Sequence, residues 1–371
     1  MPNVDSCFVC TTPYQVMAAT NYVTEGNVVA DIYIVPQFNN ARYIADNIRT
    51  LNLFRNVVFV DTSAIEKYKK RKLRLFLHFG ILINYLRIKS LVPQFHIPNI
   101  IYNKLYVSSK ANIGRLMKLY YIKKKYCFDT IYFDDGESSY DNGNIINPTK
   151  LDYFLQRLLF GKKAVESKGL LLLYSPQLFK LLNPDSTLNV EPLPLINHED
   201  KNRLLFNKIF DFSVGDCIKE KVIILDILKD ENLLKGESEK IGFMYEMLIA
   251  KFGVDNTIIK RHPRDKTNET KQYKYYKNYT IPFELLLLNM ELQNKLLVTV
   301  SSTAITIPKL LFGQEPKVIY LGNLVKTKQG NIANKKGYYE ACRKMYNTPD
   351  YFMIPKTFEE FEQIIKNFSN N

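Results

Sequence analysis

The pattern of apolar and polar positions predicts short buried strands alternating with helices. The chain opens with an apolar run at 6–10, and a helix follows in which a threonine of the pair at 11–12 caps the start and Pro13 lies early. Further strands are predicted at 31–35, 56–60, 105–108, 127–133 and 170–174, and helices at 13–23, 41–51 and 113–125. This βαβαβ opening predicts a parallel, doubly wound sheet.

A proline-containing polar stretch at 183–198 interrupts the alternation. We interpret it as an interdomain linker with a boundary near residue 190, which gives predicted domains 1–190 and 191–371. After it, strands are predicted at 221–225, 257–260, 296–300 and 317–321, and helices at 238–252, 281–289, from 301, 338–345 and 358–368. The second half is therefore a second α/β domain, and its last helix is a candidate to cross back over the first domain.

Composition adds an expectation about location. The chain has 371 residues, 46% of them hydrophobic, but no apolar window is long enough for a transmembrane helix. Residues 1–10 lack the basic and apolar regions of a signal peptide. The five cysteines are scattered, as is typical of reduced thiols. We therefore expect a cytoplasmic protein.

The charge balance favours an anionic partner. Lys and Arg outnumber Asp and Glu by 51 to 37, a net charge of +14. A basic, non-catalytic nucleic-acid-binding protein is one interpretation, although the cations are spread over many helices and no nucleic-acid-binding motif is present. The basic and then apolar segment 67–89 has two interpretations: a helix on the anionic inner face of the plasma membrane, or a long domain helix with a solvated basic end.

Candidate chemistry begins where the predicted strand 257–260 ends. Pro263 cannot continue a sheet ladder, so His262 is expected at the carboxyl end of that strand, where open α/β sheets keep their ligands. Three cations surround it: Lys260, Arg261 and Arg264. This setting suits an imidazole that meets a phosphate, and the alternative is a histidine that closes a turn.

Three further polar groups fall at predicted strand or helix ends. Asp134 and Asp135 precede Gly136, which permits a sharp turn, so one carboxylate can face a ligand while backbone donors hold the other. Ser301 and Ser302 open a helix, where they are suited to a phosphate or are plain caps. Glu284 lies in a first helical turn, where it complements the dipole or grips ribose hydroxyls.

Taken in order, these motifs resemble those of the bacterial sialyltransferases. Asp134-Asp135-Gly136 is similar to their acidic motif, His262-Pro263 to their His-Pro motif, and Ser301-Ser302 to their serine motif. The 281–284 segment and its spacing to the serines look most like glycosyltransferase family 52, the lipooligosaccharide and capsule sialyltransferases. The resemblance implies a GT-B fold: two Rossmann-like domains with the active site in the cleft between them, the first facing the acceptor and the second binding CMP.

The resemblance also implies an activity and its residues. The donor would be CMP-sialic acid and the acceptor a galactose-terminated surface glycan. The transfer would invert the anomeric centre, the expected linkage is α-2,3, and neither a cofactor nor a metal would be needed. Asp135 is the first candidate for the base, Asp134 the next, and Asp230 a rival because one family member has its base after the first strand of the second domain. The expected donor-binding residues are His262, Pro263, Glu284, Ser301, Ser302, Lys260 and Arg261. The same fold also suits another activated sugar or the polymerisation of sialic acid.

Overall fold

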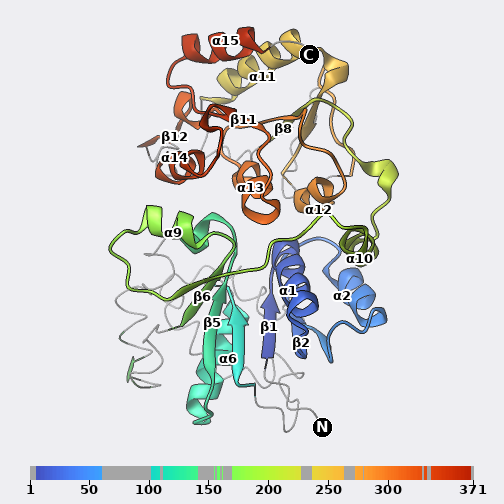
Figure 1. Ribbon diagram of the computed structural model, residues 1–371, viewed down its shortest axis with the longest axis vertical. Coiled ribbons are helices and arrows are strands. Elements are labelled where there is room, and N and C mark those ends of the chain that lie inside the picture. Colours follow the sequence, from blue (N-terminus) through green and yellow to red (C-terminus); the bar gives the residue numbers. More distant parts are fainter. Residues whose placement is uncertain are drawn as a thin grey trace. The chain divides into compact units, whose positions relative to one another are not determined.

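Two compact units make up the chain, residues 1–194 and residues 195–371. Each contains one parallel sheet flanked by helices (Figure 1). The computed structural model describes residues 6–60, 102–108, 112–140, 154, 157–158, 161, 169–226, 236–262, 272–278, 280–327, 330–331 and 336–368.

The first unit is organised around a seven-stranded sheet of order β3-β2-β1-β4-β5-β6-β7, in which every pairing is parallel. Its main elements are β1 Ser6–Cys10, α1 Pro13–Gly26, β2 Ala30–Ile34, α2 Ala41–Thr50, β3 Val57–Phe59, β4 Lys104–Val107, α6 Asn112–Lys123, β5 Asp129–Phe133, the 3-10 turn η3 Glu137–Tyr140, β6 Leu170–Leu173, α9 Pro176–Leu182 and β7 Val190–Pro192.

Side chains of β1 alternate between two helical layers, as the period of a strand requires. On one face Phe8 stacks on Tyr106, with ring centroids 4.2 Å apart, and contacts Tyr22 of α1. On the other face Cys7 joins a buried cluster that includes Met117 of α6. Helices therefore cover both faces, and the predicted doubly wound sheet is confirmed.

The predicted linker at 183–198 is wrong in part, because it contains β7. Val190–Pro192 pairs with β6 as the last strand of the sheet. Pro192 fits there because it occupies an edge strand, where the missing N–H is tolerated on the side that has no partner. The chain therefore leaves the first sheet only after residue 192, and the units divide after Pro194.

The second unit contains a five-stranded parallel sheet of order β14-β11-β10-β8-β9 and a small two-stranded sheet. Its main elements are α10 Asp200–Phe210, β8 Val222–Leu225, α11 Ser238–Phe252, β9 Thr257–Lys260, α12 Phe283–Leu288, β10 Leu296–Thr299, the 3-10 turn η7 Thr303–Thr306, α13 Ile307–Phe312, β11 Lys317–Tyr320, β12 Lys326–Thr327, β13 Gly330–Asn331, α14 Lys336–Lys344, β14 Phe352–Met353 and α15 Phe358–Asn367.

The last helix, α15, packs inside this second unit. Phe361 and Ile365 share one buried cluster with Met244 and Leu248 of α11 and with Val298 of the sheet. Figure 1 shows α11 and α15 side by side along this sheet. The idea that the last helix crosses back to the first domain is therefore corrected, because its apolar face packs against α11. Two Rossmann-like units, the composition of a GT-B protein, are confirmed.

The structure tests some of the expectations that came from composition. Each of the five cysteines lies among the described residues and is a free thiol. Within the same residues, no helix has both the length and the apolar character needed to cross a bilayer. The basic segment 67–89 lies outside the described residues.

Candidate functional site

Both sheets have a topological switch point, where ligands of open α/β folds bind outside the carboxyl ends of the strands. In the first sheet the order reverses between β1 and β4, and in the second between β8 and β10. Most of the predicted site residues follow directly on strands at these carboxyl ends. Asp134 and Asp135 follow β5, His262 comes after β9, and Ser301 and Ser302 come after β10.

Asp134 is held inside the first unit. Its carboxylate accepts hydrogen bonds from the Tyr140 hydroxyl at 2.7 Å, the Gly136 amide at 2.8 Å and the Tyr174 amide at 3.2 Å. The side chain is fully buried, and burial raises the pKa of its carboxyl group. Gly136 turns the chain with φ of +82°. Because all three donors belong to the protein, Asp134 fixes the turn, and Asp135 is the better candidate for contact with a substrate.

Asp135 is half-buried and held by an amide from another element. Its Oδ1 accepts from Nε2 of Gln15 in α1 at 2.7 Å, and its backbone N–H donates to the Ser139 hydroxyl at 2.7 Å. Sequence reasoning placed Gln15 only at the start of a helix, because no local signal reports a contact across 120 positions.

In the second unit, Thr299 organises the tip of β10. Its hydroxyl donates to the Leu225 carbonyl of β8 at 2.7 Å and accepts from the Ser302 amide at 2.9 Å and the Ser301 amide at 3.3 Å. The Ser302 hydroxyl caps η7 by accepting from the Ala304 amide at 3.3 Å. Both serine amides are therefore already bonded to the Thr299 hydroxyl. Their hydroxyls, both half-buried, are what this turn offers to a ligand.

The tip of β8 carries an acid that the sequence analysis passed over. Asp226 directly follows Leu225, is nearly fully buried, and accepts from the Tyr245 hydroxyl at 3.0 Å. Its amide donates to the Lys260 carbonyl at 3.0 Å, which ties β8 to β9. Asp230, the rival candidate, lies outside the described residues. The position directly after β8 is thus occupied by Asp226.

A buried lysine lies at the end of β9. The side chain of Lys260 is 4% exposed, and its Nζ lies 5.8 Å from the centre of the Tyr276 ring. Burial lowers the pKa of Lys260 to about 8, against the attraction of Glu284. Glu284 is in the first turn of α12, and burial raises the pKa of its carboxyl group while Lys260 opposes the rise. The carboxyl edge of β9 thus brings a cation and an acid together.

The remaining predicted residues follow the same strand. Arg261 and His262 are half-buried, and each interacts with a neighbouring group. Pro263 and Arg264 lie outside the described residues. Neighbouring strands are about 4.8 Å apart, so the tips of β10 and β9, with β8 between them, are about 10 Å apart.

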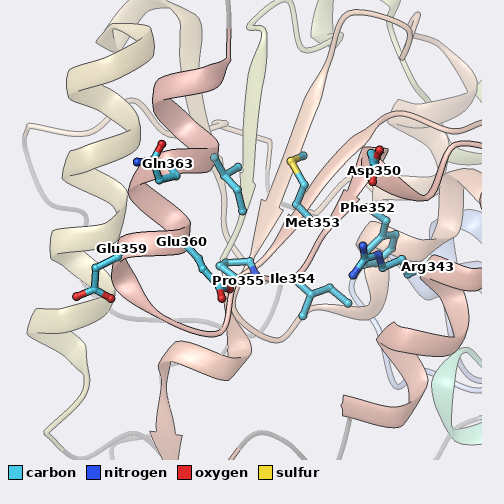
Figure 2. A pocket seen from close by; sticks show the side chains of 10 residues that line it. Arg343, Asp350, Phe352, Met353, Ile354, Pro355, Glu359, Glu360 and Gln363 are labelled. Atoms are coloured by element: carbon cyan, nitrogen blue, oxygen red, sulfur yellow. The ribbon is translucent and has the colours of Figure 1, made fainter.

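Two other features of the described residues do not coincide with these strand ends. A cavity of about 550 Å³ lies beside the edge strand β14 and is lined by α14 and α15 residues such as Arg343 and Glu360, with Phe352 and Ile354 between them (Figure 2). None of the predicted site residues lines it. Among the residues that the structure describes, no group of three or more His, Cys, Asp or Glu side chains is arranged to hold a metal ion.

No protein-family model and no curated protein matches this sequence. Solved structures with a similar fold include UGT89C1 of Arabidopsis thaliana complexed with UDP, with a TM-score of 0.48, 11% identity, and coverage of 85% of this chain and 80% of that one. The UDP-GlcNAc 2-epimerase of Methanocaldococcus jannaschii gives a TM-score of 0.47, 14% identity, and coverage of 98% and 99%. A UDP-glucosyltransferase of Polygonum tinctorium gives 0.45, 8%, and 97% of each chain. The assignment of function therefore rests on the residues of this chain.

Proposed function

We propose that this protein is an inverting sialyltransferase that moves sialic acid from CMP-sialic acid to a galactose-terminated glycan without a metal. The observation that carries the proposal is the carboxyl edge of the second sheet. There the serine pair follows β10, while Lys260, His262 and the nearby Glu284 gather at the end of β9. Hydroxyls, cations and a carboxylate at one sheet edge are the groups that a nucleotide phosphate and a ribose require.

The hydrogen-bond donors of the serine turn support a sugar donor with one phosphate. Thr299 occupies the amides of Ser301 and Ser302, so the turn presents two hydroxyls in place of a row of backbone donors. The adjacent cations supply the charge that a phosphate needs. In this proposal Glu284 binds the ribose hydroxyls, and Lys260, Arg261 and His262 attract the anionic donor.

The proposed reaction divides the chemistry between the two units. Asp135 takes the proton of the acceptor hydroxyl, and the hydroxyl oxygen bonds to the anomeric carbon of sialic acid on the face opposite CMP. The bond between that carbon and the phosphate oxygen breaks, and its electron pair stays on the phosphate. His262 either donates a proton to that phosphate or stabilises its charge as a cation. The hydroxyls of Ser301 and Ser302 donate hydrogen bonds to its oxygens. CMP and an inverted sialoside result.

Thermal unfolding with nucleotides is the first test. A ligand that binds only the folded state stabilises it by about 2.7 kcal/mol when its concentration is a hundred times the Kd. We expect CMP to raise the Tm, UMP and UDP to raise it less, and S301A/S302A to lose most of the CMP effect. T257V is the control, because Thr257 lies at the opposite end of its strand and its hydroxyl has no hydrogen-bond partner among the described residues.

Turnover is the second test. Incubation of the full chain with CMP-sialic acid and lactose should release CMP and form sialyllactose, whereas UDP-glucose and UDP-N-acetylglucosamine should remain intact. A Tm that responds to UDP but not to CMP, with transfer from a UDP-sugar, would replace sialic acid by another sugar on the same fold. A product longer than one sialic acid on an oligosialic acceptor would make the enzyme a polysialyltransferase. A protein that responds to no nucleotide would overturn the proposal.

A further inference from the structure

A side-chain amide joins the first turn of α1 to the acidic turn that follows β5. Gln15 is fully buried, and its Nε2 donates to Oδ1 of Asp135 at 2.7 Å. Its Oε1 accepts from the Thr11 amide at 2.6 Å and from the Thr11 hydroxyl at 3.0 Å. Both ends of the amide are therefore used, one by the loop after β1 and the other by Asp135.

The orientation of this amide follows from its partners. A backbone N–H can only donate, so the atom that faces the Thr11 amide must be the Gln15 oxygen. The nitrogen then faces Asp135, and because an NH2 group cannot accept, the carboxylate oxygen is the acceptor. A hydrogen bond given to a carboxylate favours its ionised form, which is the form that accepts a proton.

The turn itself is fixed on its other side. Asp134 is anchored by three donors, and the Asp135 amide donates to the Ser139 hydroxyl at 2.7 Å, so the backbone of the turn is held independently of Gln15. The bond from Gln15 thus reaches the Asp135 carboxylate from a distant element. Among the described residues, the titratable groups around this turn include Cys10 of β1, Tyr14 of α1, Tyr174 after β6, and Asp134, Glu137 and Tyr140 around the end of β5.

We infer that Gln15 is a positioning residue, which holds the Asp135 carboxylate ionised and in one orientation for the proton it takes from the acceptor hydroxyl. The inference rests on the proposed function, in which Asp135 is the base. Gln15 does not touch the reacting atoms, and its effect passes through Asp135.

Two substitutions of Gln15 separate this role from a purely structural one. Q15E keeps an oxygen for Thr11 but places a second carboxyl group against Asp135, where two acids in contact cannot both ionise freely. Q15M keeps the approximate volume and removes the donor. N21A is the matched control: Asn21 is another buried amide of α1, and it donates to the Pro194 carbonyl at 2.9 Å.

The first readout does not depend on activity. In protein labelled with 13C at the aspartate carboxyl, the resonance that disappears in D135N belongs to Asp135, and its titration gives the pKa. We expect this pKa to rise by about one unit or more in Q15E and to rise in Q15M, with no change in N21A. An Asp135 pKa that moves no more in Q15E and Q15M than in N21A overturns the inference, whatever the enzyme does.

The second readout uses sialyl transfer. The acidic limb of the kcat/KM profile should move to higher pH in Q15E by the same amount as the Asp135 pKa, with the CMP-induced rise in Tm unchanged. If wild-type protein neither binds CMP nor transfers sialic acid, the proposed function fails, while the titration still decides the contact between Gln15 and Asp135. If wild type is active and the Q15E profile equals that of N21A, the positioning role fails and the proposed function stands.

Discussion

The two adjacent aspartates after β5 have opposite surroundings, and this difference predicts opposite effects. Asp134 accepts three protein hydrogen bonds in a buried site, whereas Asp135 is half-buried. We expect D134N to lower the free energy of unfolding by about 2 kcal/mol, because an amide NH2 would face donors. We expect D135N to leave stability nearly unchanged and to lower kcat about a hundredfold or more. Urea denaturation and initial rates measure the two effects.

The opposite assignment has a clear signature. A D134N protein of normal stability with lost transfer, beside an active D135N protein, would make Asp134 the base. If both variants transfer at the wild-type rate, the base lies elsewhere, and Asp226 at the end of β8 is the buried acid to substitute next.

Lys260 predicts a dependence of stability on pH. Its pKa is lowered to about 8 by burial, so between pH 8 and about 10.4 the unfolded chain binds a proton that the folded chain does not. Protonated Lys260 therefore lowers the free energy of unfolding below pH 8, and this loss disappears as the pH rises from 8 to about 10.4. Replacement by methionine removes this cost. The free energy of unfolding of K260M minus that of wild type should therefore be roughly 2–3 kcal/mol larger at pH 7 than at pH 10.

Chemical unfolding of both proteins at the two pH values measures this gain. Other titrating groups are common to both chains, so the difference between the proteins isolates Lys260. K317M serves as the control, because Lys317 at the start of β11 is exposed. A K260M gain that is equal at pH 7 and pH 10 contradicts a lowered pKa.

Which residues lie at the strand ends was predictable from the sequence, but which of them touch was not. The strand before His262 and the turn after β5 follow from β-branched runs, Pro263 and Gly136. The hydrogen bond from Gln15 to Asp135 and the clamp of Thr299 on the serine turn depend on tertiary placement. Neither has a local pattern, because each side chain is also ordinary helix-start or strand chemistry.

At the scale of elements, one hydroxyl makes three hydrogen bonds at the tip of β10. Thr299 joins β10 to β8 and bonds the amides of both serines. T299V keeps the shape but leaves the Leu225 carbonyl and both amides without this partner. We expect a loss of about 2–3 kcal/mol in the free energy of unfolding and weaker CMP binding by about tenfold.

The matched control for this substitution is in the same sheet. Thr257 of β9 is also buried, but within the part of the chain that the structure describes its hydroxyl has no hydrogen-bond partner. T257V should therefore be neutral or slightly stabilising, because it replaces an unsatisfied polar group by a methyl group. Equal losses of stability in T299V and T257V, measured in urea, would show that the hydroxyl of Thr299 does not hold the tip.

Elements with one strong signal were predicted well. The bounds of α11 and β9 agree with the sequence pattern, 238–252 and 257–260. Helix α10 was missed, because Leu204 is 62% exposed while the polar Asn202 is buried, which blurs the apolar period. Strand β7 was missed because a proline and a glutamate in three residues are typical of a linker, and pairing with β6 makes it a strand.

At the scale of the whole molecule, the proposal divides the work between two units with separate cores. The first unit carries the aspartates, and the second carries all the described candidates for donor binding. The net charge of +14 is spread over the whole sequence and does not by itself distinguish a nucleotide from another anion. The binding site of a nucleotide is therefore best tested by which backbone amides it protects from hydrogen exchange.

Hydrogen exchange on the full chain with and without CMP tests this division. At a hundredfold excess over Kd, bound CMP adds about 2.7 kcal/mol to openings that release it, which slows the affected amides about a hundredfold. We expect the slowing in peptides that cover the ends of β8, β9 and β10 and the start of α12, with little change around Asp135. Protection centred on the turn after β5, or on the cavity beside β14, would place the nucleotide elsewhere and would contradict the assignment of donor binding to the second unit.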